Sequence, residues 1–149
     1  MDNIVYGVTM AIEAYFGDDI KIYEDTVKQG FSKPCFIVLP EKSEMKRMSI
    51  GRFLKTQTIK VIYYPESLKE RNEMEETAFM LSAALRKIKW QGDSYAGKNM
   101  RWEEDNEKLT FRAEFETVLY WDPSMDHADE DEDDSDLMRI MNYGENVDN

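Results

Sequence analysis

Residues 65–90 read PESLKERNEMEETAFMLSAALRKIKW. Apolar side chains recur in this stretch at alternating steps of four and three residues, which places them along one side of a helix. They are Met74, Ala78, Leu81, Leu85 and Ile88. Pro65 pushes the residue before it into extended geometry, and Ser67 with Glu70 has the spacing of a capping box. We therefore predict one long central helix that ends before Gly92.

The charges along this stretch favour the same helix. Acidic residues fill its first turns and basic residues fill its last turn, which suits the partial charges at the two helix ends. They are Glu70, Glu73, Glu75 and Glu76 at the start, and Arg86, Lys87 and Lys89 at the end. Such a helix is long enough to span a small domain, so the other segments are expected to be strands that it covers.

The chain before this helix predicts a shorter helix and several strands. Asp2 or Asn3 can cap the first helix, which ends at Gly17. The apolar side of that helix is predicted to be Ile4, Val8, Ala11, Ile12 and Tyr15. A short strand at 20–24 and a loop at 25–33 are expected to follow, and then an apolar strand at 34–39 that Pro40 stops.

Residues 41–52 are polar and basic, and we interpret them as an extended hairpin connection. A strand at 53–64 follows, with Ile59, Val61 and Tyr63 on one face. After the long helix, segments 98–103 and 107–121 are predicted to be strands. The second alternates strictly between apolar and polar residues, which is typical of a half-buried strand. Its apolar series is Leu109, Phe111, Ala113, Phe115, Thr117, Leu119 and Trp121.

These elements predict an α+β domain over residues 1–121. We expect an antiparallel or mixed β-sheet, with the N-terminal helix and the long central helix packed on one face, and a long β-hairpin. Residues 122–149 are predicted to be an acidic C-terminal extension. Its run 129–134 contains only Asp and Glu and cannot form a core, whereas a short apolar patch follows it at 137–143.

Charge is concentrated in that extension. The 149-residue chain has a net charge of −12, and residues 122–149 hold eleven acidic side chains against the single base Arg139, a net −10. The rest of the chain is therefore close to neutral, at −2. It lacks the basic face of a protein that reads DNA grooves. No run approaches the roughly 18 apolar residues of a membrane span, so no membrane partner is expected.

Catalytic chemistry has few candidates. His127 is the only histidine and lies in the acidic extension, where a solvated surface residue is expected. Cys35 lies inside an apolar run and is predicted to be a buried, inert thiol, which fits a reducing compartment. No phosphate-binding loop, metal-ligand motif or EF-hand order is present, so we predict no catalytic residue, no metal site and no cofactor. Trp90, Trp102 and Trp121 are interpreted as core or interface anchors.

Protein interfaces are the remaining candidate sites. The basic stretch 42–55 also contains methionines, which adapt to irregular surfaces, although a solvated hairpin or a phosphate contact is also compatible with it. The apolar patch of the extension is a second candidate. The predicted interface residues are Lys42, Met45, Lys46, Arg47, Met48, Arg52, Leu137, Met138, Ile140, Met141 and Tyr143.

The order of these features resembles the tail terminator, or tail completion, proteins of tailed phages and phage-tail-like particles. The resemblance rests on Gly17-Asp18-Asp19-Ile20-Lys21-Ile22-Tyr23, on Gln29-Gly30-Phe31-Ser32-Lys33-Pro34-Cys35-Phe36, and on Ile62-Tyr63-Tyr64-Pro65 before the long helix. It covers residues 1–121. The acidic extension is not part of it.

The resemblance implies a structural virion protein that is not an enzyme. Such a protein would cap the tail tube as a homohexameric ring, stop tail polymerisation, and offer a surface to a neck or connector protein or, in a contractile tail, to the sheath. DNA would only pass through the ring. The location implied is a virion or prophage-encoded tail, assembled in the bacterial cytoplasm.

Two other classes stay open. An acidic adaptor or inhibitor could mimic nucleic acid through the extension, and it would then be a monomer that binds a basic partner with steep salt dependence. A hydrolase would need a cluster of carboxylates that the sequence does not reveal.

Overall fold

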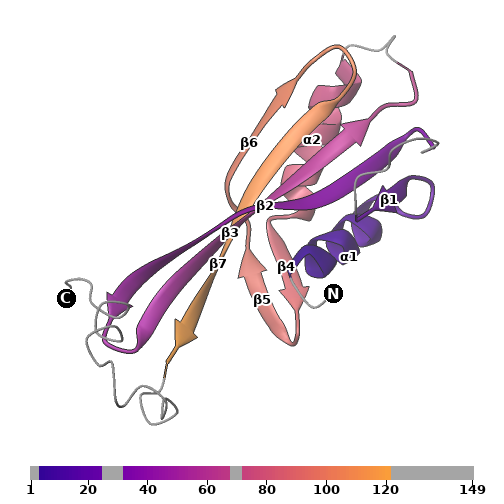
Figure 1. Ribbon diagram of the computed structural model, residues 1–149. Helices are drawn as coiled ribbons and strands as arrows, with labels where there is room; N and C mark the ends of the chain where they lie inside the picture. The colour runs from indigo at the N-terminus through magenta and orange to yellow at the C-terminus, as the bar shows by residue number, and fades with distance from the viewer. Residues whose placement is uncertain (1–3, 25–31, 68–71, 122–149) are drawn as a thin grey trace. The chain divides into compact units, whose positions relative to one another are not determined.

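The computed structural model describes residues 4–24, 32–67 and 72–121 (Figure 1). These residues form two helices and seven strands, in an α+β arrangement as predicted. In chain order they are α1 (Ile4–Phe16), β1 (Lys21–Tyr23), β2 (Cys35–Ser49), β3 (Arg52–Tyr64), α2 (Asn72–Ala84), β4 (Lys87–Trp90), β5 (Asp93–Ala96), β6 (Lys98–Glu104) and β7 (Leu109–Tyr120). The predicted extension at 122–149, the cap at Asp2 or Asn3, and most of the loop at 25–33 lie outside the described residues.

The chain divides into two compact units. Unit 1 comprises residues 1–42 and 57–115, and unit 2 comprises residues 43–56 and 116–149, of which the structure describes 43–56 and 116–121. Strands β2, β3 and β7 each contribute residues to both units.

Five strands form one sheet in the order β1-β2-β3-β7-β6. The sheet is mixed, because β1 pairs with β2 in parallel, with Ile22 opposite Phe36, whereas β6 and β7 are antiparallel, with Trp102 opposite Phe111. The prediction that Pro40 stops a strand is wrong, since β2 continues to Ser49. The pairing of β2 with β1 runs from Cys35 to Ile37, so Pro40 lies beyond it on β2.

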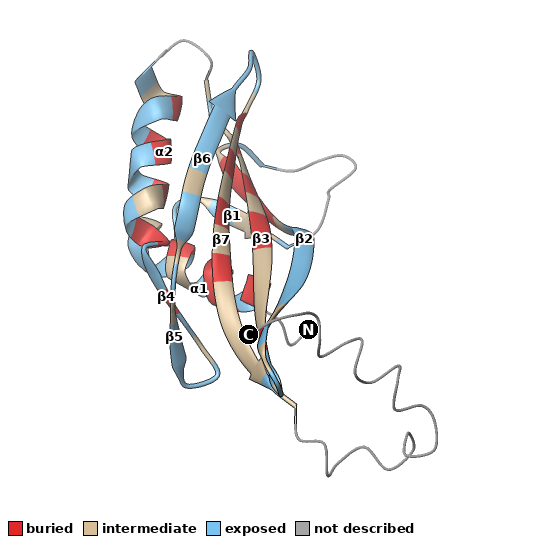
Figure 2. Cartoon of the chain, turned by 90° about the vertical axis from the view of Figure 1, so that its left-hand side faces the viewer, coloured by how far each residue is buried: buried red, intermediate tan, exposed pale blue. Residues whose placement is uncertain are grey.

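The core of unit 1 lies between the sheet and the two helices, which Figure 2 shows on the same side of the sheet. Alternate residues of the central strands supply the sheet side: Ile59, Val61 and Tyr63 from β3, and Leu109, Phe111, Ala113 and Phe115 from β7, all buried. This alternation agrees with the prediction for both strands. The alternation in burial ends after Phe115: Thr117 and Leu119 are only partly buried, like the residues between them.

Helix α1 covers part of this core with Ile4, Val8 and Ile12, as predicted, and it ends at Gly17. Tyr15 was predicted on the same side but is half exposed, with its ring tilted against that of its neighbour Phe16. Gly7 brings α1 close to β4: a Cβ added there would lie 2.9 Å from the carbonyl oxygen of Lys89. A larger side chain at this position would therefore push α1 away from β4.

The central helix is shorter than predicted. Met74, Ala78, Leu81 and Leu85 are buried on one side as expected, but α2 ends at Ala84. The start expected near Ser67 and Glu70 falls on residues 68–71, which are outside the described part of the chain. Tyr63 Oη donates a hydrogen bond of 2.5 Å to Glu73 Oε2, which ties the first turn of α2 to β3. Burial, followed by this carboxylate, raises the pKa of Tyr63.

The last part of the predicted helix is a β-hairpin. Residues Lys87–Trp90 form β4 and pair antiparallel with β5, so Arg86, Lys87 and Lys89 do not lie in a last helical turn. Gln91 and Gly92 both have positive φ, which is the two-residue turn that matches the twist of a hairpin. Ile88 continues the helical spacing of the sequence and remains buried, but it does so from a strand.

The core predicts the effect of a charge at Leu81. Leu81 is fully buried, so Leu81→Asp places an unpaired carboxylate in the core at a cost of several kcal/mol and prevents folding. Phe79→Asp is the matched control on the same helix, because Phe79 is 73% exposed. We expect the control to change stability by about 0.5 kcal/mol or less. Circular dichroism during thermal unfolding measures both, and a folded Leu81→Asp variant with unchanged melting temperature contradicts this core.

Candidate assembly surfaces

The predicted interface residues Met45, Lys46, Arg47, Met48 and Arg52 are brought together in unit 2, on the two strands of one hairpin. We call residues 43–56 and 116–121 the hairpin surface. Lys42 is the last residue of the first segment of unit 1 and is not part of it. The other predicted interface residues, Leu137, Met138, Ile140, Met141 and Tyr143, lie outside the described residues.

The turn of this hairpin is fixed by a glycine and by the end of β7. Ile50 and Gly51 connect β2 to β3, and Gly51 has a φ of +76°, which a side chain would strain. The amide of Trp121 donates a hydrogen bond of 2.8 Å to the carbonyl oxygen of Gly51. A Cβ on Gly51 would approach the carbonyl oxygen of Trp121 to 3.1 Å. The end of β7 is therefore held at the hairpin turn.

Sequence reasoning missed the contribution of β7 to this surface. Tyr120 is 73% exposed, and the guanidinium of Arg52 lies 5.8 Å from the centre of its ring, a cation–π distance. Ile50 is 69% exposed at the turn, and Met45 and Met48 are also exposed. The signal in the sequence was that the strand pattern continues beyond Phe115, the last residue of β7 in unit 1. The hairpin surface thus combines exposed apolar and basic side chains.

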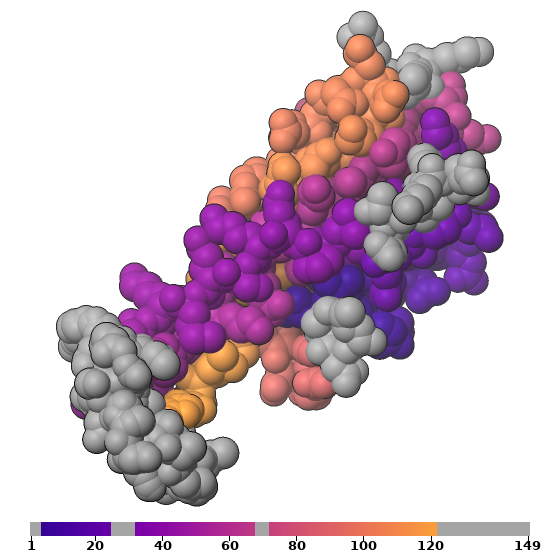
Figure 3. All heavy atoms as spheres, in the orientation of Figure 1, coloured from indigo at the N-terminus to yellow at the C-terminus, as the bar shows by residue number. Residues whose placement is uncertain are grey.

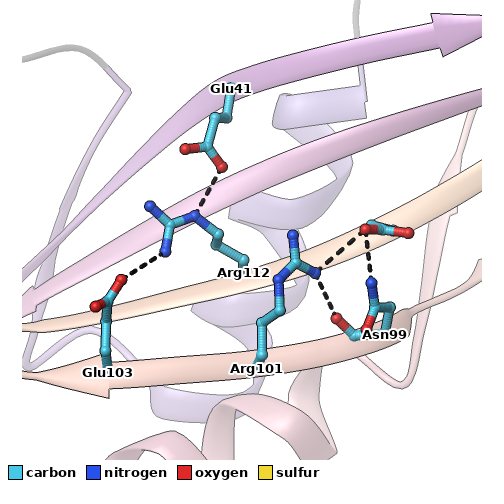
Figure 4. Close-up of polar contacts among 6 residues, drawn as sticks. Glu41, Asn99, Arg101, Glu103 and Arg112 are labelled. Atoms are coloured by element: carbon cyan, nitrogen blue, oxygen red, sulfur yellow. Dashed lines mark hydrogen bonds and ion pairs between the residues drawn. The ribbon is translucent and has the colours of Figure 1, made fainter.

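A network of charged side chains covers the sheet of unit 1 on the side away from the helices (Figure 4). Arg112 of β7 bridges two strands: its Nε donates to Glu41 of β2 at 2.8 Å, and its Nη1 donates to Glu103 of β6 at 3.0 Å. Glu114 accepts bonds from Arg101 at 3.2 Å and from Asn99 at 2.8 Å. The strands that carry these side chains also form the near surface in Figure 3.

This network shifts the pKa values of its two bridged groups. The hydrogen bond from Arg112 holds the pKa of Glu41 below its ordinary value, and the same bond raises the pKa of Arg112. Both groups are partly exposed, so solvent screens the pair and its contribution to stability is modest. Sequence reasoning did not identify this network, because it joins residues 71 positions apart along the chain.

Two shallow apolar grooves lie in unit 1. One is lined by Tyr6 and Met10 of α1 and by Trp90 of β4, with the Tyr6 and Trp90 rings edge to face at 5.7 Å. The other is lined by Phe79 and Met80 of α2 and by Trp102 of β6, which stacks on Phe111. Trp90 is therefore half-buried and Trp102 exposed, and each lines a groove instead of being fully enclosed in the core.

The candidates for catalytic and metal chemistry can be located only in part. Cys35 is fully buried, as predicted, and burial raises the pKa of its thiol. Within residues 4–24, 32–67 and 72–121, no group of three His, Cys, Asp or Glu side chains is placed to hold a metal ion. His127 lies outside these residues. Neither of the two described helices is long and apolar enough to cross a membrane.

The network predicts how Glu41 responds to the loss of its partner. Arg112→Gln should raise the pKa of Glu41 toward its ordinary value, as measured by carboxyl NMR titration. A depressed carboxyl pKa stabilises the fold above the unfolded-state value, and this stabilisation is lost as the pH falls through the folded-state value. The stability difference between the variant and the parent, about 1 kcal/mol or less, should therefore disappear in acid.

Arg101→Gln is the matched control for that titration. Arg101 acts on Glu41 only at a distance and is the weakest of the influences on its pKa. It should therefore move the Glu41 titration less than Arg112→Gln does. Equal shifts in the two variants would show that the hydrogen bond from Arg112 does not set this pKa.

Comparison with known proteins finds one family. A family model described as phage tail terminator protein matches residues 3–127, a range that contains every described helix and strand. No curated protein matches the chain.

Proposed function

We propose that this chain, which belongs to the phage tail terminator family, caps the last ring of the tail tube, stops its polymerisation, and does so as a homohexameric ring. The observation that carries the proposal is the family match, which covers well over half of the chain. A family of this kind is structural and associates with other tail components. The capping step and the ring are our inference.

The hairpin surface is the proposed contact with a neighbouring subunit or with the tube protein. Lys46, Arg52 and Met45 lie there in a chain whose overall net charge is −12. Opposite charges on one subunit and its neighbour steer association and fix its orientation. The exposed methionines and Tyr120 supply adaptable apolar area at the same place. This combination supports a contact that forms only when the subunit meets its assembled partner.

The acidic extension is proposed to contact a protein other than the tube protein. Its run 129–136 repels DNA and other acidic partners. Its apolar patch, Leu137 to Tyr143, docks on a neck or connector protein, or on the sheath if the tail is contractile. DNA then passes through the ring without being bound. This role requires no catalytic group and places the protein in a virion tail or a headless tail-like particle.

The hairpin surface predicts a tail-length defect. Lys46→Glu with Arg47→Glu reverses its charge, so we expect a folded protein that fails to complete tails and leaves them with uncontrolled length. Lys21→Glu with Lys87→Glu is the matched control, because both lysines are exposed in unit 1 and the change in net charge is the same. Electron microscopy of tail lengths compares the two. Tails of normal length from the hairpin variant would contradict the contact.

Two truncations test the docking patch. A chain that stops after Asp136 lacks only the patch, and a chain that stops after Pro123 lacks the acidic run as well. We expect both truncated chains to form rings on the tail tube, as measured by light scattering. We also expect both to leave heads or sheaths unattached. If both complete particles as well as the full chain does, the extension is only a solubilising segment.

The alternative function is an acidic adaptor, and the oligomeric state distinguishes it from a tail terminator. A chain that stays monomeric when tail tubes are added, and that binds a basic protein with steep salt dependence, would favour the adaptor. The family match supports the terminator role instead.

A further inference from the structure

The hairpin surface and the C-terminal extension carry opposite charges. The described residues of unit 2 include four basic side chains against two acidic ones, Glu44 and Glu116, a net charge of +2. Residues 122–149 carry a net −10. The most acidic stretch of the chain is therefore tethered directly to its basic hairpin.

Both the hairpin surface and the C-terminal extension also contain apolar side chains. Met45, Ile50 and Tyr120 are exposed large apolar side chains on the hairpin surface. In the extension, the acidic run is followed by the apolar patch at 137–143. Each segment thus has a charged part and an apolar part, with charges of opposite sign.

The chain leaves the described structure at the turn of the hairpin. Trp121 is its last described residue, and its amide is bonded to Gly51. Seven residues separate Trp121 from Asp129, and the eight steps between them span about 26 Å when extended. The β2 arm of the hairpin surface, residues 43–49, is about 23 Å long at the usual rise of a strand. The acidic run can therefore reach any point of this arm within unit 2.

We propose that, in the free subunit, residues 129–143 dock on the hairpin surface of their own chain. Side chains alternate along a strand, so Lys46 and Met48 of β2 share one face of the hairpin, and Met45 lies on the other. The two-residue turn at Ile50 and Gly51 places Lys55 of β3 opposite Lys46, on the same face as Met48. On that face the acidic run lies against Lys46 and Lys55, and the apolar patch covers Met48 and Ile50. A tethered segment meets a neighbouring surface at an effective concentration of about 1 mM. Its own hairpin therefore competes well against a second copy at micromolar protein. The docked segment keeps the surface from binding other proteins or DNA until assembly displaces it.

Oxidation of methionines by hydrogen peroxide tests this docking on the full chain. Met45 and Met48 are 57% and 39% exposed, and Met10 and Met80 of unit 1 are 46% and 38% exposed. Without a cover, Met48 should react at about the rate of Met80, which is equally exposed. A docked form populated nine times in ten would slow Met48 about tenfold relative to Met80, whereas Met45 on the opposite face should stay fast. Mass spectrometry of peptides gives the four rates from one sample.

Variants of the extension identify the cover. One replaces the six carboxylates at 129–134 with their amides, and the other replaces Leu137, Ile140 and Met141 with Ser. The matched control neutralises six exposed carboxylates of unit 1: Glu13, Asp18, Asp19, Glu24, Glu75 and Asp93. We expect either extension variant to restore fast oxidation of Met48, and the control to leave it slow. About 1 M NaCl, which screens charges within about 3 Å, should also speed the oxidation of Met48.

Three results would overturn the proposal. Equal rates for Met48 and Met80 in the full chain show that this face of the hairpin surface is uncovered. Slow oxidation that survives both extension variants assigns the cover to another part of the protein. Slow oxidation that appears only as the protein concentration rises assigns it to a second copy. The docking does not depend on the role in tail termination, so defective tails and absent docking are separate failures.

Discussion

The fold of unit 1 depends on one packing interaction, the burial of two helices against alternate side chains of β3 and β7. Val61, Phe111 and Phe115 present a continuous apolar face because successive strand residues point to opposite sides of the sheet. Leu81 of α2 and Val8 of α1 are fully buried against it. The other side of the same strands is then left to water, and there Arg112 joins Glu41 and Glu103 into a charged network. The alternation of side chains along each strand thus separates the buried core from the polar surface.

The elements that sequence reasoning located correctly are those in which one period holds over many residues. β7 alternates from Leu109 to Phe115, and the burial follows the same residues. The error in α2 has a physical cause: Ile88 fits the helical spacing but is buried from β4, because the Gln91–Gly92 turn pairs that strand with β5. A turn that needs two residues at positive φ is favoured by Gly92 but not by Gln91, so the sequence signal for it was weak.

The candidate surfaces were predictable only in part. Basic residues and methionines that are close in sequence, such as Met45 and Lys46, could be assigned to one hairpin. Tyr120 could not, because it reaches that hairpin from a strand some 70 residues later, through the bond from Trp121 to Gly51. The apolar groove beside Trp102 likewise joins α2 to β6. Contacts of this kind follow from strand order, which local patterns do not specify.

The continuity of β2, β3 and β7 through both units has a consequence for what evolution can change. Side chains alternate along a strand, so an insertion of one residue within 43–56 would exchange the inward and outward faces of everything that follows it in the same strand. The exposed side chains of the hairpin surface could vary freely, yet the length of the hairpin is bound to the pairing that buries Ile59 and Val61. Sequence drift in this family member is therefore expected to change the chemistry of the hairpin while its residue count stays fixed.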